Sequence, residues 1–279
     1  MPDNSGTFNS AHIQRLKVSQ EAQLPKFQAL RVISALMIRE MITRYGRSWG
    51  GYFWAVAEPV GMIAMLSLAF SQFLKTPPLG SSFMLFYAAG YLPFSFYMTI
   101  NSMTSQAVSS NRQLMQYPMV TPMDAIFARC ILQVLTMIVV TVIILVAFSY
   151  VIDERITISM PEFISACLAA TILGLGGGTL NVVLFTYIPS YKNVWSIISR
   201  PLFLVSGIFY TVETMPANVQ TILLWNPLVH VTGEAHKAFY PTYNGDFVIL
   251  AYPIGLGVLM FMVGAGLIMR NRGYIIENA

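Results

Sequence analysis

The stretch RYGRSWGGYFWAVAEPV, from Arg44 to Val60, passes from arginines to an apolar run and then places an acid, Glu58, inside that run. Basic residues beside an apolar segment are typical of the cytoplasmic edge of a membrane-spanning helix. A carboxylate inside such a helix costs about 2.5–3.5 kcal/mol on insertion scales, so it must face a partner or a cavity. The stretch therefore predicts a membrane protein with a special environment around Glu58.

The composition of the whole chain agrees with this interpretation. Of its 279 residues, 56% are hydrophobic and only 10% are charged, whereas soluble domains have about 25% charged residues. The length allows several spans with short connections, but no sizeable soluble domain. The first 28 residues are polar and lack the basic-then-apolar pattern of a cleavable signal peptide. We expect residues 1–23 to form a flexible cytoplasmic N-terminus.

A membrane-crossing helix needs about 20 mostly apolar residues. By this criterion we predict an all-α integral membrane protein with six spans, at residues 52–74, 83–108, 131–152, 163–188, 194–212 and 247–269. The span at 194–212 is the weakest, because it contains Arg200 and Pro201. Residues 213–240 are broken by prolines, so we expect a re-entrant helical segment on the periplasmic side. The transmembrane domain would cover 48–270, followed by a cytoplasmic tail at 271–279.

The distribution of lysine and arginine sets the orientation. With six spans both termini share one side of the membrane, and thirteen of the 16 basic residues fall on that side. The remaining three, Lys75, Arg155 and Lys237, fall on the other. The positive-inside rule therefore places both termini in the cytoplasm.

The segment before the first span, residues 24–47, has the pattern of an amphipathic helix. At 100° per residue its apolar side chains gather on one face, namely Phe27, Leu30, Met37, Ile38, Met41 and Tyr45. A basic helix of this kind lies in the cytoplasmic interface, with its arginines beside anionic headgroups. An orientation anchor followed by a belt of aromatic residues explains most of this pattern, and a gate for a substrate is the alternative.

Glu58 lies near the cytoplasmic end of the first span, beside Pro59, which weakens the local helix backbone. Arg200 is similarly shallow in the fifth span and is the nearest candidate counter-charge. We therefore predict either a structural ion pair between Glu58 and Arg200 or a role for Glu58 in gating the cytoplasmic entrance.

Several catalytic motifs are absent from the sequence. No lysine follows a glycine, so the chain lacks a Walker A loop and cannot bind ATP in that mode. It also lacks HExxH, GxSxG and any metal-ligand spacing of Cys and His, so we expect no cofactor and no metal on this chain. His230 and His236, with Glu213 and Glu234 nearby, are the acid–base candidates if the chain is an intramembrane enzyme.

The run GLGGG, from Gly174 to Gly178, is not a phosphate loop, because no strand precedes it and no lysine follows it. Gly174 and Gly178 form a GxxxG pair. Such a pair predicts a face on which another membrane helix packs closely.

Three stretches resemble one family of membrane proteins. They are REMITRYGRSWGGYFWAVAEPV (Arg39–Val60), NRQLMQYPMVTP (Asn111–Pro122) and SGIFYTVETMPANVQTILLWNPLVH (Ser206–His230). From about Leu24 onward the chain is similar to the ABC-2-type polysaccharide export permeases, and most to the capsular polysaccharide transporter membrane subunit of Gram-negative bacteria. The loop PSYKNVW (Pro189–Trp195) lacks the Arg-Asp pair expected in O-antigen and teichoic-acid permeases, which favours the capsule branch.

The resemblance implies the membrane subunit of an ATP-driven ABC exporter that moves a lipid-linked, acidic capsular-type polysaccharide across the inner membrane. It implies a homodimer with two copies of a separate ABC ATPase subunit, which would bind ATP and Mg²⁺. It also implies a periplasmic adaptor and outer-membrane export proteins as partners, and no nucleic acid. The alternatives are an O-antigen, teichoic-acid, lipid or drug exporter of the same class, and an intramembrane enzyme.

The resemblance also implies three groups of functional residues. The substrate entrance and its gate would comprise Arg31, Arg39, Arg44, Tyr45, Arg47, Trp49, Trp54, Glu58 and Arg200. The translocation path would follow an aromatic stripe in the second span, made of Phe83, Tyr87, Tyr91, Phe94 and Tyr97. Coupling to the ATPase would use Arg112, Gln113, Tyr117, Pro118, Tyr191 and Lys192.

Overall fold

The computed structural model describes residues 28–45, 50–116, 119–152 and 157–278, which contain helices and no β-strand. Five of these helices are long and apolar enough to cross a membrane: α3 (Gly50–Ser71), α4 (Phe83–Ser105), α6 (Pro122–Val151), α7 (Met160–Tyr187) and α11 (Ala251–Arg270). The predicted all-α membrane fold is therefore confirmed. The predicted N-terminal segment, 1–23, lies outside the described residues.

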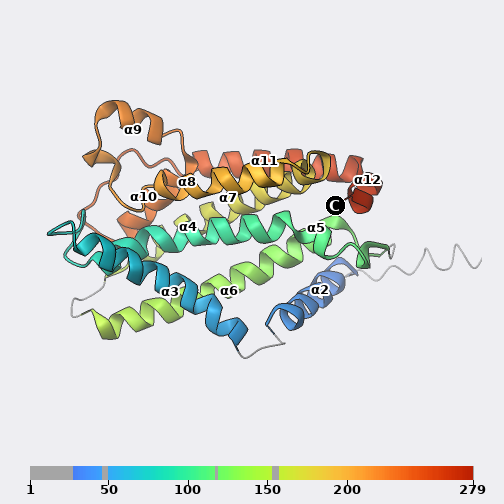
Figure 1. The fold of residues 1–279 in the computed structure, drawn as a ribbon, viewed down its shortest axis with the longest axis horizontal. Helices are drawn as coiled ribbons and strands as arrows, with labels where there is room; N and C mark the ends of the chain where they lie inside the picture. Colours follow the sequence, from blue (N-terminus) through green and yellow to red (C-terminus); the bar gives the residue numbers. More distant parts are fainter. Residues whose placement is uncertain (1–27, 46–49, 117–118, 153–156, 279) are drawn as a thin grey trace, which may run out of the picture.

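Helix α4 occupies the centre of the bundle. Figure 1 shows it between α3 and α6 on one side and α7 and α11 on the other, and it packs against α3, α6, α7 and α10 (Pro227–Phe239). Most of its length is buried, including Phe86, Ala88 and Leu92, which have no exposed surface. A helix that is apolar on all sides is expected in such a central position.

Glycines of α7 bring its backbone close to both neighbours. A Cβ atom added to Gly174 would lie 2.9 Å from the carbonyl oxygen of Tyr97 on α4, and one added to Gly178 would lie 2.7 Å from Thr104. On the α11 side, a Cβ on Gly176 would lie 2.0 Å from the carbonyl oxygen of Gly257. The close packing predicted from the GxxxG pair is confirmed.

Helix α6 begins well before the predicted boundary at Ile131. Its first turn is closed by a capping box, in which Thr121 accepts a hydrogen bond from the backbone of Asp124 and Asp124 accepts one from the backbone of Thr121. Further along, Arg129 is buried and ion-paired. Asp124 and Arg129 lie before the predicted span, and the charges of both are satisfied within the folded helix.

The predicted fifth span, 194–212, is corrected by the structure. Helix α8 covers Tyr191–Leu204 and then stops. The carbonyl of Val205 accepts a hydrogen bond from the Asn226 side chain at 2.9 Å, and the carbonyl of Ser206 accepts one from Thr232 at 2.6 Å. These bonds replace the next helical turn, and Gly207 follows with a positive φ of 77°. Three short helices then come before α11: η2 (Val212–Thr214), α9 (Ala217–Leu223) and α10.

The first and last described helices meet at one end of the bundle. Leu36 of α2 (Gln28–Tyr45) and Ile275 of α12 (Arg272–Asn278) belong to one buried apolar cluster. The cluster is completed by residues such as Val108 of α5 (Ala107–Ser110) and Met115 of η1 (Leu114–Gln116). Figure 1 shows α2 and α12 at the same end, as expected when both termini lie on one side of the membrane.

The contact between α7 and α11 gives a direct test of the packing. Replacing Gly257 by Ala would put the new Cβ 2.7 Å from the carbonyl oxygen of Ile172, whereas Gly255, on the same helix, has no atom within 4 Å. Gly257→Ala is expected to destabilise the protein by about 1–3 kcal/mol through overpacking, and Gly255→Ala to be neutral or slightly stabilising. Thermal unfolding of the two purified variants measures the difference, and equal unfolding temperatures would refute the close contact.

Candidate functional site

Helix α2 is held against α6 by a buried ion pair. Arg129 Nη2 lies 2.7 Å from Glu40 Oε1, and the two side chains are only 10% and 16% exposed. The other terminal nitrogen of Arg129 donates a hydrogen bond to the carbonyl of Met103 at 3.2 Å. Glu40 and Arg129 were not among the predicted site residues. The available signal was that Glu40 is the one acid of the basic helix α2 and Arg129 the one basic residue of the apolar helix α6.

A second polar contact ties α2 to the cytoplasmic loop between α5 and α6. Arg39 Nη1 donates to Asn111 Oδ1 at 2.8 Å, and Asn111 Nδ2 donates to the carbonyl of Ala107 at 2.9 Å. Arg39 was predicted to attract an anionic group at the gate. In the structure one edge of its guanidinium is already engaged, so Arg39 connects the gate helix to the loop.

The packing face of α2 differs from the predicted one. Leu30, Ile38 and Met41 are 62%, 56% and 41% exposed, whereas Leu36 is buried at 7%. Val32, Ile33 and Met37 pack against the same cluster as Leu36, so Met37 is the one residue of the predicted face, among those whose side chains are described, that belongs to the buried side. The side chains of Phe27 and Tyr45 lie outside the described part of the structure. The helix thus has one apolar side against the protein and a second that the chain leaves uncovered. The helical period located apolar residues but could not tell protein-facing from lipid-facing ones.

The other predicted gate residues lie at the ends of α2 and α3. Arg31 is exposed, and Trp54 is 68% exposed near the start of α3. Arg44 and Tyr45 belong to the last turn of α2, but their side chains are outside the described part of the structure, and Arg47 and Trp49 lie outside the described residues altogether.

Glu58 borders a small cleft between α3, α4 and α6. The cleft has a volume of about 70 Å³ and is lined mainly by residues with hydroxyl, amide or carboxylate groups, namely Glu58, Tyr91, Ser95, Thr99, Gln133 and Thr136. Glu58 itself is exposed in the single chain. An acid at span depth thus meets a set of polar side chains, which is how an intramembrane carboxylate is stabilised.

The predicted pair of Glu58 and Arg200 does not form within one chain. Among the described residues, the ion pairs are Glu40–Arg129 and Glu234–Lys237. Helix α3, which carries Glu58, packs on α4 and α6, whereas α8, which carries Arg200, packs on α7 and, through Phe203 near its end, on α4. Both charges are exposed.

The aromatic stripe of α4 forms part of the core. Tyr87, Tyr91, Phe94 and Tyr97 are at most 8% exposed, and Phe83 is half-buried. The rings of Tyr87, Tyr91 and Phe94 pack with those of Phe70, Phe203 and Phe209. In the single chain the stripe therefore stabilises the contact between α3, α4 and the end of α8, and does not border an open channel. The even three-to-four spacing is common to core and lumen faces, so the sequence could not separate them.

The predicted coupling residues lie at the end of the bundle that carries α2 and α12. Arg112 and Gln113 are exposed in the loop after α5, and Lys192 is exposed at the start of α8, next to the half-buried Tyr191. Tyr117 and Pro118 lie outside the described residues.

The acid–base candidates have structural partners. His230 Nδ1 accepts a hydrogen bond from the backbone N–H of Ile249 at 3.1 Å, and its Nε2 lies 3.0 Å from the carbonyl oxygen of Leu224. Glu234 accepts hydrogen bonds from Ser165 and Lys237. His236 stacks on Phe86 at 4.8 Å, and burial lowers its pKa to about 4. His230 and Glu234 are thus held by hydrogen bonds within the chain, and His236 is buried.

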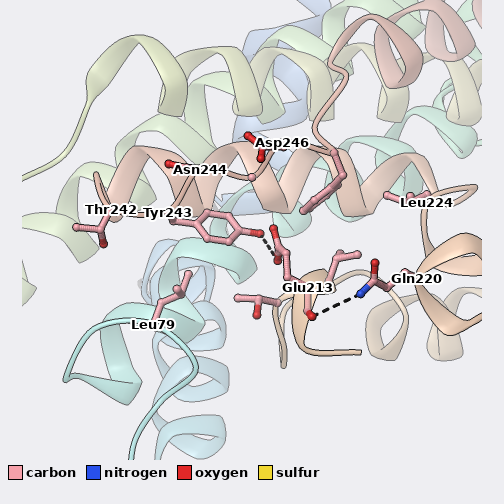
Figure 2. Close-up of a pocket in the computed structure, with 12 residues that line it drawn as sticks. Leu79, Glu213, Gln220, Leu224, Thr242, Tyr243, Asn244 and Asp246 are labelled. Atoms are coloured by element: carbon pink, nitrogen blue, oxygen red, sulfur yellow. Dashed lines mark hydrogen bonds between the residues drawn. The ribbon is translucent and has the colours of Figure 1, made fainter. Parts of the chain in front are cut away.

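The opposite end of the bundle carries a pocket with a volume of about 560 Å³. Figure 2 shows Tyr243 extending toward Glu213, whose carboxylate accepts a hydrogen bond from the tyrosine hydroxyl at 3.0 Å. Burial and the nearby carboxylate raise the pKa of Tyr243. Gln220 donates to the carbonyl of Met215 at 2.8 Å and so fixes the turn before α9. The pocket is thus formed by loops that hydrogen bonds hold in place.

Comparison with known proteins agrees with this arrangement. The sequence profile described as "ABC-2 type transporter" matches residues 31–240, well over half of the chain.

The chain belongs to the ABC-2 type transporter family.

Three relatives of this ABC-2 transporter chain are similar over most of its length. The polysialic acid transport protein KpsM of Escherichia coli is 30% identical over 238 residues, covering 84% of this chain and 91% of the relative. The capsule polysaccharide export inner-membrane protein BexB of Haemophilus influenzae is 29% identical, covering 86% and 89%. The capsule polysaccharide export inner-membrane protein CtrC of Neisseria meningitidis serogroup A is 28% identical, covering 86% and 91%.

The ion pair between α2 and α6 can be tested by removing one charge or both. Arg129→Met leaves the Glu40 carboxylate buried without its partner, which is expected to cost about 3–5 kcal/mol, whereas Glu40→Met combined with Arg129→Met should recover most of this loss. Thermal unfolding of the purified ABC-2 transporter chain measures stability, and maleimide labelling of Leu36→Cys, in a background without Cys130 and Cys167, reports release of α2. Equal labelling in the wild-type and Arg129→Met backgrounds would contradict the conclusion that the ion pair holds α2 against α6.

His236 predicts a pH dependence of stability. The pKa of His236 is about 4 in the folded chain and about 6.5 in the unfolded chain. Between about pH 4 and about pH 6.5 the unfolded chain therefore binds a proton at this residue that the folded chain does not bind. Stability should therefore fall as the pH decreases from about 6.5 toward 4. The drop in unfolding temperature between pH 7 and pH 5 should be smaller in His236→Gln, which carries no charge at either pH. An equal drop in both proteins would mean that His236 is not the titrating group.

Proposed function

We propose that this chain is the membrane subunit of an ATP-driven exporter that moves a lipid-linked, acidic capsular-type polysaccharide across the bacterial inner membrane. The observation that carries the proposal is the similarity, over more than four-fifths of the chain and about nine-tenths of each relative, to proteins named for polysialic acid transport and capsule polysaccharide export. The exposed apolar side chains of the long helices favour a lipid-facing surface around the bundle.

The energy for export would come from a separate ABC ATPase subunit, present in two copies, which binds ATP and Mg²⁺. The absence of a Walker A lysine in the sequence supports the assignment of ATP binding to a separate subunit. Export beyond the inner membrane would use a periplasmic adaptor and outer-membrane proteins. The polar pocket around Glu213 and Tyr243 lies at the end of the bundle where such a protein would bind.

The functional unit would be a homodimer in which α3 and α8 meet their counterparts. None of the residues of α8, all of which the structure describes, is fully buried within the chain, and it exposes Ile197 and Ile198 at 68% and 50%. Glu58 is eight residues after the start of α3, and Arg200 is nine after the start of α8, so both lie about 12–14 Å along their helices. Equal depth and exposure support a pair between Glu58 of one copy and Arg200 of the other.

The gate would be α2, lying in the cytoplasmic interface with Leu30, Ile38 and Met41 toward the acyl chains. Its remaining basic and aromatic residues, together with the start of α3, would form the portal; they are Arg31, Arg44, Tyr45, Arg47, Trp49 and Trp54. From the portal the glycan would pass the polar cleft at Glu58 and Tyr91. The other residues of the α4 stripe are buried, so they would stabilise the helices beside this path and would not contact the glycan.

Residues 213–240 would form the re-entrant segment, and α8 with the turns that follow it would make the fifth of six crossings. The carbonyl of Ala238 accepts a hydrogen bond from the backbone of Ser159, at the start of α7, at 2.8 Å. At the other end of α10, Leu228 lines a cavity together with Leu173. Since Leu173 is 14 residues beyond Ser159, α10 reaches about 20 Å down α7. This depth supports a segment that enters the membrane and returns.

Deletion of the gene and complementation would test the proposed function. Cells without this chain should accumulate lipid-linked polysaccharide in the cytoplasm and lose it from the surface, and the full chain with its ATPase should restore export. Loss of O-antigen, teichoic acid or a small lipid, with normal capsule, would instead assign the chain to another branch of the exporters.

Charge exchange tests the proposed pair across the dimer. Glu58→Lys alone should reduce surface polysaccharide by about tenfold, as expected from the loss of about 1.4 kcal/mol of favourable interaction, because two cations then face each other. Combining Glu58→Lys with Arg200→Glu should restore export to near the wild-type level, measured by quantitative immunoblot of cell-surface glycan. A double variant as impaired as the sum of the single ones would exclude a direct pair.

A further inference from the structure

We propose that the C-terminal helix α12 holds the cytoplasmic loop 111–121 in position for the ATPase and forms part of the surface on which the ATPase docks. The inference rests on the proposed function in one respect, namely that a separate ABC ATPase binds this end of the chain. The loop connects α5 to α6, and α12 is the last helix of the chain.

Two arginines connect the loop and the helix at opposite ends of both. Arg112, at the start of the loop, donates a hydrogen bond to the carbonyl of Glu277 in the last turn of α12. Arg272, at the start of α12, donates one to the carbonyl of Val120 at the end of the loop, at 3.1 Å. Because each contact joins a charged donor to a backbone carbonyl, each fixes the course of the backbone more than a contact between flexible side chains would.

Apolar contacts fasten α12 to the bundle between these two arginines. Ile275 is fully buried in the cluster that contains Val108 and Met115. Tyr274 stacks on Tyr187, at the end of α7, with ring centroids 5.0 Å apart. The side chain of Ile275 is fully removed from water, and this burial holds the seven-residue helix against the bundle.

The same region presents an unoccupied cleft. It has a volume of about 110 Å³, and its lining comes from α4, the turn that follows it, α5, α7, α8 and α12, through Gln106, Ser109, Phe185, Lys192 and Asn278 among others. The cleft thus brings Lys192, a predicted coupling residue, together with Asn278 of α12. Around it Gln113, Gln116 and Met119 of the loop and Tyr274 of α12 are exposed.

The occupant that fits this surface is the ATPase subunit. The chain has no ATP-binding lysine motif of its own, and this end also carries α2, whose Arg39 holds Asn111 at the start of the loop. A partner that presses on the loop would therefore act on α2 and α12 together. The surface is polar, with exposed Arg112 and Lys192, and so suits a soluble protein that offers carboxylates and carbonyls.

Three variants of the full chain in lipid nanodiscs, titrated with the purified ATPase subunit, test the inference. Arg272→Ala removes the hydrogen bond to Val120 and keeps Ile275, so the unfolding temperature should stay near that of the wild type. Its affinity for the ATPase should fall about tenfold, the loss expected for one hydrogen bond to a charged group. Asn278→Trp places a bulky side chain at the cleft and should weaken binding by at least as much. Arg270→Ala, an exposed basic residue two positions before Arg272, is the matched control and should bind normally.

Hydrogen exchange separates positioning from simple loss of structure. In Arg272→Ala the amides of loop 111–121 should exchange faster while those of α4 and α7 remain protected, and Arg272→Lys should restore part of both the protection and the binding. If the wild-type chain binds the ATPase, and Arg272→Ala and Asn278→Trp bind it equally well, the role of α12 is overturned. If the wild-type chain binds no ABC ATPase, the proposed function fails as well, so the two failures are distinguishable.

Discussion

Contact between helix backbones across α7 sets the arrangement of this membrane bundle. In lipid there is no hydrophobic driving force between helices, so association depends on how closely the backbones approach. Gly174 and Gly178 let α4 lie against one side of α7, and Gly176 lets α11 lie against another. With α4 and α11 fixed in this way, α10 fills the space beside them against α7 and α4. The central position of α4, and the burial of its aromatic stripe, follow from these glycines.

Polar contacts inside the bundle join helices that are far apart in the sequence, whereas Glu58 and Arg200 stay exposed. Glu40 is neutralised by Arg129, and Asn181 donates to Asn101 at 3.2 Å between α7 and α4. Glu58 and Arg200 have no such partner within the described chain, and both are exposed. An unpaired charge inside a membrane is costly, which is why the proposed dimer pairs the two residues across copies.

Much of the fold could be predicted from the sequence, because the length and apolar character of a span are local properties. The helices α3, α4, α7 and α11 lie close to their predicted positions. Three features could not be predicted, since each depends on contacts between distant residues. The early start of α6 requires Glu40 to neutralise Arg129, and the end of α8 requires hydrogen bonds from Asn226 and Thr232. Likewise, nothing in the spacing of the α4 stripe tells a core face from a lumen face.

At the cytoplasmic end, the gate helix and the proposed ATPase surface share one piece of backbone. Asn111, at the start of loop 111–121, is bonded to Arg39 of α2, while Val120, at its end, is bonded to Arg272 of α12. The next residue after Val120, Thr121, caps α6, and α6 carries Arg129, the partner of Glu40 on α2. The loop is therefore connected to α2 at two adjacent residues, directly at Arg39 and through α6 at Glu40. Because both contacts involve charged groups, they hold α2 to the loop and to α6, and on the proposed function a movement of the ATPase against the loop would reach α2 directly.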